Sequence, residues 1–265
     1  MKKLFISLSI SYLLCACSCS SYNETREKLI LAESLMTERP DSSLQLIYGI
    51  DTLALKSRED VALYSLILTQ AEDKNYIDRT DARIIRRAAD YYGRSGDEFH
   101  KMLSFFYLAR IEQNAEDYSK AIVDLMKAEK VGLAIEDYFY LGMIYSTFSD
   151  IYNSVYSNVE SMKCAQKSHD CFLKIGRDDY ADWEIVDMWR AYNNSCDYIT
   201  AIKYAHKIVE TAERKDEKLL LCEGLRSLGM SNLGGGYYQE SINAYIRLLK
   251  EFPDNSEIWE LLMSA

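Results

Sequence analysis

Two groups of polar residues recur at intervals of 40 positions, and both could hold a peptide. One group is charged, and the other carries side-chain amides. They are Arg110, Asp150 and Arg190, and then Gln113, Asn153 and Asn193. An amide both donates and accepts hydrogen bonds, so a row of amides can pair with the backbone of an extended peptide whatever its sequence. The arginines could bond acidic side chains or a terminal carboxylate. The alternative is that these residues solvate a helix face, with the arginines paired to Asp150 across repeats.

Other residues that could carry chemistry lack the spacing that it requires. Cys164, His169 and Cys171 fall on one predicted helix, without a Cys-x-x-Cys or His-x-x-x-His pair that would indicate a metal site. The glycines of 234–236 lack the Gly-Lys-Ser/Thr of a phosphate loop and favour a turn. We therefore expect no enzyme activity, no cofactor and no metal. Cys196 and Cys222 could pair in an oxidising compartment, although free thiols are the favoured interpretation.

The charge balance excludes one class of partner. The chain has 265 residues, with 41 acidic and 31 basic side chains, and its formal net charge is −10. A nucleic-acid binder needs a basic face to neutralise phosphates. We expect a protein or peptide partner, and no nucleic acid.

The N-terminal segment has the composition of a secretory signal. Met1-Lys2-Lys3 is basic, and residues 4–14 are apolar but too short to span a membrane. The following Leu14-Cys15-Ala16-Cys17 resembles the lipobox of bacterial lipoproteins. The resemblance implies a signal peptide over 1–16, a lipid on Cys17 and a linker over 17–22. Cys19 is a weaker candidate for lipidation, and an ordinary cleaved signal is the alternative.

The residue after the cysteine bears on the location. Ser18 is not the Asp that commonly retains such lipoproteins at the inner membrane. We therefore expect an outer-membrane lipoprotein of the bacterial envelope that faces the periplasm.

The spacing of 40 extends to small and apolar residues, which predicts the fold. One column is small and another is large and apolar. They are Ala121, Ser161, Ala201 and Ser241, and then Leu108, Phe148, Met188 and Leu228. Small residues let two helices approach closely, and large ones fill the space beside them. Each unit is then a helical hairpin whose open apolar face is covered by the next. We predict an all-α fold, an α-solenoid of antiparallel hairpins.

This pattern resembles the tetratricopeptide repeat (TPR). Leu228-Gly229, Ser241 and Pro253 match its motif in one unit, and Leu108-Ala109 with Ala121 match it in another. The resemblance implies a superhelix whose first helices line the concave surface. The period is 40 rather than 34, and Trp189 occupies a small-residue position. We expect the repeat domain to cover 23–265, with about six hairpins and the start of a seventh first helix at Asn255.

Two further expectations concern modification and role. Asp51-Thr52-Leu53 resembles the tripeptide that one Gram-negative phylum O-glycosylates, which makes Thr52 a candidate site. We expect a membrane-anchored scaffold that binds a protein or peptide. The chain also resembles bacterial repeat lipoproteins whose longer members continue into a membrane helix and a cytoplasmic regulatory domain. The alternative is therefore the sensor half of a larger transmembrane regulator.

Overall fold

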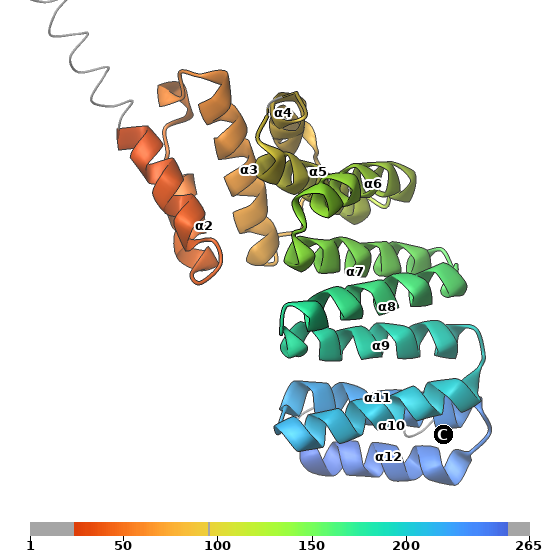
Figure 1. The fold of residues 1–265 in the computed structure, drawn as a ribbon. Coiled ribbons are helices and arrows are strands. Elements are labelled where there is room, and N and C mark those ends of the chain that lie inside the picture. The colour runs from red at the N-terminus through yellow and green to blue at the C-terminus, as the bar shows by residue number, and fades with distance from the viewer. Residues whose placement is uncertain (1–23, 95, 254–265) are drawn as a thin grey trace, which may run out of the picture. The chain divides into compact units, whose positions relative to one another are not determined.

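The computed structural model describes residues 24–94 and 96–253, and all of their regular structure is helical (Figure 1). The predicted signal peptide, Cys17, the linker to residue 22 and the predicted helix from Asn255 lie outside these residues. Within the described part, no helix combines the length and the apolar character that crossing a bilayer requires.

The helices alternate along the chain as first and second members of hairpins. Residues 24–35 form an initial helix. The elements that follow are α2 (Pro40–Tyr48), the 3₁₀ turn η1 (Thr52–Ala54), α3 (Arg58–Lys74), α4 (Arg83–Tyr92), α5 (Glu98–Asn114), α6 (Tyr118–Ile135), α7 (Tyr138–Ser154), α8 (Asn158–Lys174), α9 (Asp178–Asn194), α10 (Tyr198–Lys215), α11 (Lys218–Gly234) and α12 (Tyr238–Glu251). The prediction of six hairpins up to residue 252 is confirmed. Helix α4 begins at Arg83, whose N–H donates to the Asp81 carboxylate just before the helix (3.0 Å).

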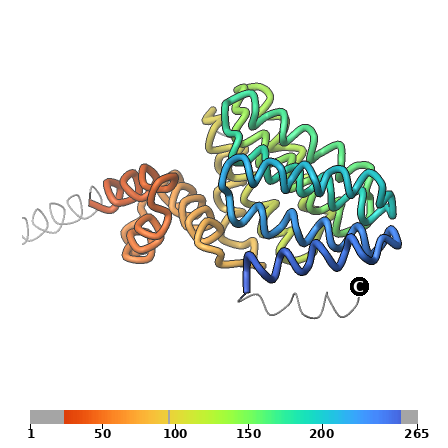
Figure 2. Tube along the Cα trace, turned by 90° about the horizontal axis from the view of Figure 1, so that it is seen from below, coloured from red at the N-terminus to blue at the C-terminus, as the bar shows by residue number. Residues whose placement is uncertain are grey.

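The chain divides into two compact units, 1–135 and 136–265. In the second unit, consecutive helices from α7 to α12 lie side by side (Figures 1 and 2). First helices also contact the first helix of the next hairpin, as α7 does with α9 and α9 with α11, whereas the second helices make no comparable contact with one another. In the first unit α3 contacts α5 in the same way. The first helices of each unit therefore share one face.

The hairpin turns repeat the same backbone geometry at intervals of 40 residues. Each first helix from α3 to α11 is followed by a residue with positive φ. These residues are Tyr76, Glu116, Tyr156, Cys196 and Gly236. After α7, for example, the Tyr156 N–H donates to the Asn153 carbonyl (3.0 Å) and the Ser157 N–H donates to the Tyr152 carbonyl (2.8 Å). This is the Schellman pattern, which satisfies the last carbonyls of a helix. The turns confirm the register that the side-chain columns predict.

The small-residue column lies at the crossing between the two helices of a hairpin. Ala121, Ser161, Ala201 and Ser241 are at most 1% exposed. The Ser241 hydroxyl donates to the Gly229 carbonyl across the crossing (2.8 Å). Close approach of the helix axes therefore requires small side chains at these four positions.

Large and small residues compensate for one another within each hairpin. Trp189, which departs from the expected small residue, packs in one apolar cluster with Ala205 of the second helix. One repeat later the pair is reversed, because Gly229 lies against the ring of the fully buried Tyr245. The volume of the hairpin core is thus conserved although its residues are not.

Candidate peptide-binding face

Four of the six predicted groove residues lie in the second unit, on the face shared by the first helices. Asp150 and Asn153 are on α7, and Arg190 and Asn193 are on α9. The Arg190 guanidinium lies 2.5 Å from the Asp187 carboxylate and 3.7 Å from that of Asp150. The structure therefore contains the pairing of Arg190 with Asp150 that was the alternative to a free arginine.

The two asparagines are linked to neighbouring side chains through their carbonyl oxygens. The Asn194 amide donates to the Asn153 Oδ1 (2.7 Å). The Ser231 hydroxyl on α11 donates to the Asn193 Oδ1 (2.9 Å), and accepts in turn from the Trp189 indole N–H (2.8 Å). Among the described residues, the Nδ2 groups of Asn153 and Asn193 make no hydrogen bond. The two amides are thus held in place by their oxygens, and the Nδ2 group of each is available to donate to a ligand.

The remaining two predicted residues belong to the first unit. The Arg110 Nε lies 3.0 Å from the Asp73 carboxylate of α3, and its Nη1 donates to the Gln113 Oε1 (2.8 Å). Arg110 therefore connects the first helices α3 and α5, as Arg190 connects α9 with α7.

Carboxylates on the same face of the second unit were missed in the sequence. Glu184 is 4% exposed, and burial together with nearby Asp187 raises its pKa to about 8. Burial likewise raises the pKa of Asp187 although Arg190 opposes this, and Asp150 and Glu223 add to the increase. Glu184 is buried beside Ser146 and Ser168 in the helix packing. Asp187 precedes Arg190 by three positions, which places it on the same side of the helix. The separation of three positions between Asp187 and Arg190 was the signal in the sequence that could have identified this carboxylate.

Carboxyl groups therefore outnumber the arginine on this part of the face. Asp150, Asp187 and Glu223 surround Arg190, which is engaged by two of them. The face is suited to a cationic group more than to the acidic group that the arginines alone suggest.

Three other points of the sequence analysis concern Thr52, Cys196 and metal ligands. Thr52 is exposed in η1, where the Asp51 carboxylate accepts from the Leu53 N–H (2.9 Å). Cys196 is an exposed free thiol at the turn after α9, so no disulfide joins it to Cys222. In the described ranges, no three His, Cys, Asp or Glu side chains cluster as a metal site would require.

The comparisons with known proteins concern the fold. No family model and no curated protein sequence matches this chain. Its structure is similar to the apo form of RapI, with a TM-score of 0.65 and 15% identity, over 94% of this chain and 69% of RapI. It is also similar to PH0952 of Pyrococcus horikoshii, a signal-transduction ATPase with a tetratricopeptide-repeat sensor, with a TM-score of 0.69 and 18% identity, over 92% of this chain and 39% of PH0952. A third similar structure is NprR in complex with its cognate peptide NprX, with a TM-score of 0.61 and 15% identity, over 90% of this chain and 71% of NprR. The chain has an all-α, TPR-like helical-repeat fold.

Proposed function

We propose that this protein is a membrane-anchored binding module that holds a protein or an extended peptide segment on its first helices. The observation that carries the proposal is the pair of asparagines on α7 and α9. Their carbonyl oxygens are fixed by Asn194 and Ser231, and their N–H donors are available for a ligand backbone. The similarity to NprR, whose structure contains a bound peptide, supports a ligand of this kind.

The carboxylates of the same face define the chemistry of the partner. A lysine or arginine side chain beside Asp150 and Asp187 would restore the charge balance that Arg190 provides only in part. We therefore propose a segment that contains at least one basic side chain.

The test is partner capture by the protein purified from membranes after cross-linking. The double substitution Asn153→Ala and Asn193→Ala should abolish capture while circular dichroism shows an intact fold. Lys207→Ala, on the exposed side of the second helix α10, is the matched control and should capture normally. Undiminished capture by the double variant would move the site away from the first helices.

The anchor is the second part of the proposal. Leu14-Cys15-Ala16-Cys17 supports a lipid on Cys17, and several acyl chains hold a protein stably at a bilayer where one is marginal. Cys17→Ala should release the protein from the outer-membrane fraction or block its maturation. A mature variant that still sediments with membranes would refute the lipid anchor.

A second candidate function is that of a sensor unit, which the similarity to the tetratricopeptide-repeat sensor of PH0952 favours. A sensor must pass ligand binding on to an output. Cross-linking of the membrane-bound protein should then recover a second partner whose yield changes when the first is added. A yield that stays constant would favour the scaffold.

A further inference from the structure

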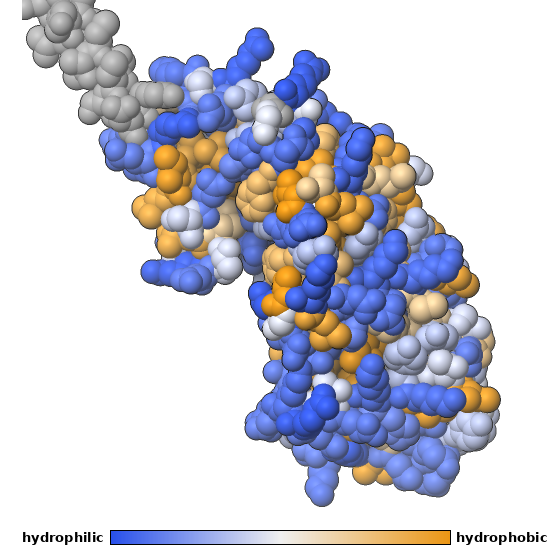
Figure 3. All heavy atoms as spheres, in the orientation of Figure 1, coloured by the Kyte–Doolittle hydropathy of each residue, from blue (hydrophilic) through white to orange (hydrophobic). Residues whose placement is uncertain are grey.

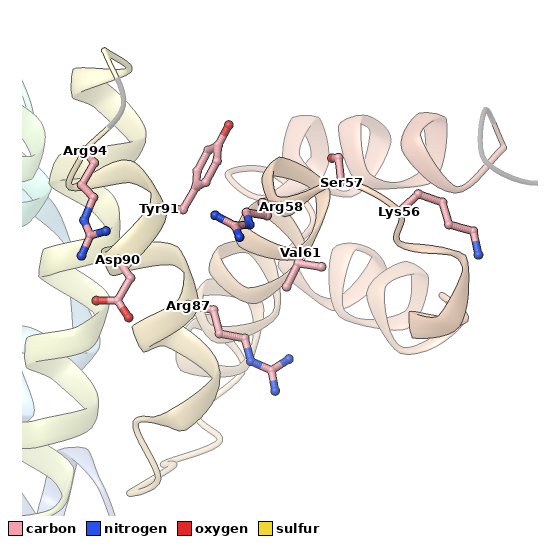
Figure 4. Close-up of a pocket in the computed structure, with 8 residues that line it drawn as sticks. All are labelled: Lys56, Ser57, Arg58, Val61, Arg87, Asp90, Tyr91 and Arg94. Carbon is pink, nitrogen blue, oxygen red and sulfur yellow. The ribbon is translucent and has the colours of Figure 1, made fainter.

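A basic pocket lies in the first unit, between the start of α3 and helix α4. It has a volume of about 620 Å³. Lys56, Ser57, Arg58 and Val61 line it from the start of α3, and Arg87, Asp90, Tyr91 and Arg94 line it from α4 and the residues after it (Figure 4). Four cationic side chains and one carboxylate therefore line the pocket, in a chain whose net charge is −10.

The arginines of this pocket differ from their neighbours because they have no carboxylate partner. Several other arginines of the same unit are paired, as Arg79 is with Glu72 (2.7 Å) and Arg86 with Glu112 (3.0 Å). Among the described residues, Arg58, Arg87 and Arg94 form no ion pair. Unpaired guanidinium groups that line one cavity attract an anion, and they suit phosphate oxygens in particular.

The pocket is close to the end of the chain that carries the predicted lipid. Arg26, in the first described helix, bonds Glu59 (2.9 Å) and Asp60 in the first turn of α3, next to Arg58. Residue 24 follows Cys17 by seven positions, and seven residues span at most about 25 Å. A lipid on Cys17 would therefore keep the pocket within reach of the bilayer surface.

Helix α4 packs its apolar side into the protein and leaves a basic side exposed, which an anionic surface could contact. Ile85, Ala88 and Tyr92 are buried on one side, and the opposite side carries arginines. Tyr91 is half-buried at the pocket, and tyrosine is favoured where an apolar body meets a polar boundary.

From these observations we propose that the pocket binds the phosphate of an anionic phospholipid headgroup in the membrane that holds the anchor. The location of the pocket near the bilayer rests on the proposed lipid at Cys17. The contact is a second attachment beside the acyl chains, and it would fix which side of the first unit faces the membrane.

The experiment uses the whole protein purified from membranes and placed in phosphatidylcholine vesicles with or without phosphatidylglycerol. Hydrogen–deuterium exchange is followed in 56–61 and 87–94. With phosphatidylglycerol at low salt, exchange there should slow by roughly tenfold, since each basic residue near an anionic surface adds attraction that salt screens. Arg87→Glu with Arg94→Glu should abolish the effect, and Lys207→Glu with Arg214→Glu, a matched change on α10, should retain it. If the charge reversal disturbs the circular dichroism, Arg94→Gln replaces it and should weaken the effect.

Three results would overturn the proposal. The first is equal exchange in both kinds of vesicle. The second is the same protection from soluble glycerol phosphate without anionic lipid, which would indicate a small anion. The third is protection by a polyglutamate peptide but not by phosphatidylglycerol, which would indicate an acidic protein partner. Intact mass reports the anchor separately: acylated Cys17 with unprotected helices refutes the pocket alone, and protected helices without acylation refute the anchor alone.

Discussion

Replacing Gly229 by alanine tests the helix crossing on which the repeat packing depends. Gly229 is on α11, and a Cβ atom there would lie 2.3, 2.5 and 2.7 Å from three ring carbons of Tyr245 on α12. Carbon atoms that are not bonded prefer about 3.5–4.0 Å. The ring would therefore have to move by about 1 Å, and it is fully buried beside Leu225 and Leu248.

Two opposing effects determine the magnitude. Overpacking of this kind costs about 1–3 kcal/mol. Alanine in place of glycine within a helix recovers up to about 1 kcal/mol of helix propensity. We therefore expect Gly229→Ala to lower the free energy of unfolding by about 1–2 kcal/mol. In a protein of this size, each kcal/mol lowers the melting temperature by about 2–4 °C.

The assay is urea unfolding followed by circular dichroism, in two backgrounds. In the wild-type background Gly229→Ala should destabilise. With Tyr245→Ala, which recreates the small residue found at Ala205 one repeat earlier, the same substitution should be neutral or stabilising because the ring is gone. If Gly229→Ala raises the stability of the wild-type protein, or if its effect is equal in both backgrounds, the inferred contact between Gly229 and the Tyr245 ring is wrong.

Three further predictions follow from buried groups. Ala201→Leu should destabilise by about 1–3 kcal/mol, because Ala201 is fully buried at a crossing, and an unchanged urea midpoint would contradict that. The raised pKa of Glu184 means that the folded protein binds a proton that the unfolded chain has lost, so stability should fall as pH rises from about 4.5 to about 8, and unfolding of Glu184→Gln at several pH values should show a shallower fall. Burial opposes the charge of His100, but hydrogen bonds to Glu33 and Asp97 outweigh it and raise the pKa to about 9. The stability that charged His100 adds to the folded protein is therefore complete below about pH 6.5 and is lost as the pH rises through about 9. His100→Gln should therefore be less stable than wild type at pH 6 and similar to it above pH 9, whereas a deficit that is independent of pH would contradict the charged pair.

The fold could be predicted because its physical requirements recur in every repeat. The small column at Ala121, Ser161, Ala201 and Ser241 marks a helix crossing each time, and its spacing fixes the period. The positive-φ positions could not be predicted from residue type, since Tyr156 and Cys196 occupy a conformation that usually favours glycine. The surrounding hairpin sets that backbone, and the hydrogen bonds of the turn offset its strain. Trp189 could not be explained from its own column, because the compensating Ala205 is on the other helix.

The candidate face could be predicted only in part. The columns correctly assign Asn153 and Asn193 to first helices, but they do not show that the carbonyl ends of these amides are already bonded. Arg190 looks available for a ligand in the sequence. In the structure Asp187, one turn earlier on the same helix, holds it. The Asp187–Arg190 spacing is visible in the sequence, but the contact of Arg190 with Asp150 and the bonds of the two asparagines depend on distances between helices, which a period does not determine.

Site-specific photo-cross-linking in living cells tests the central claim most directly. A photoreactive residue replaces Asn193 on the first helix α9, and in a separate variant it replaces Lys207 on the second helix α10. The proposed function predicts that the Asn193 position forms a discrete cross-linked product with a protein or peptide that contains a basic segment, and that the Lys207 position does not. Products from Lys207 with none from Asn193 would contradict binding on the first helices.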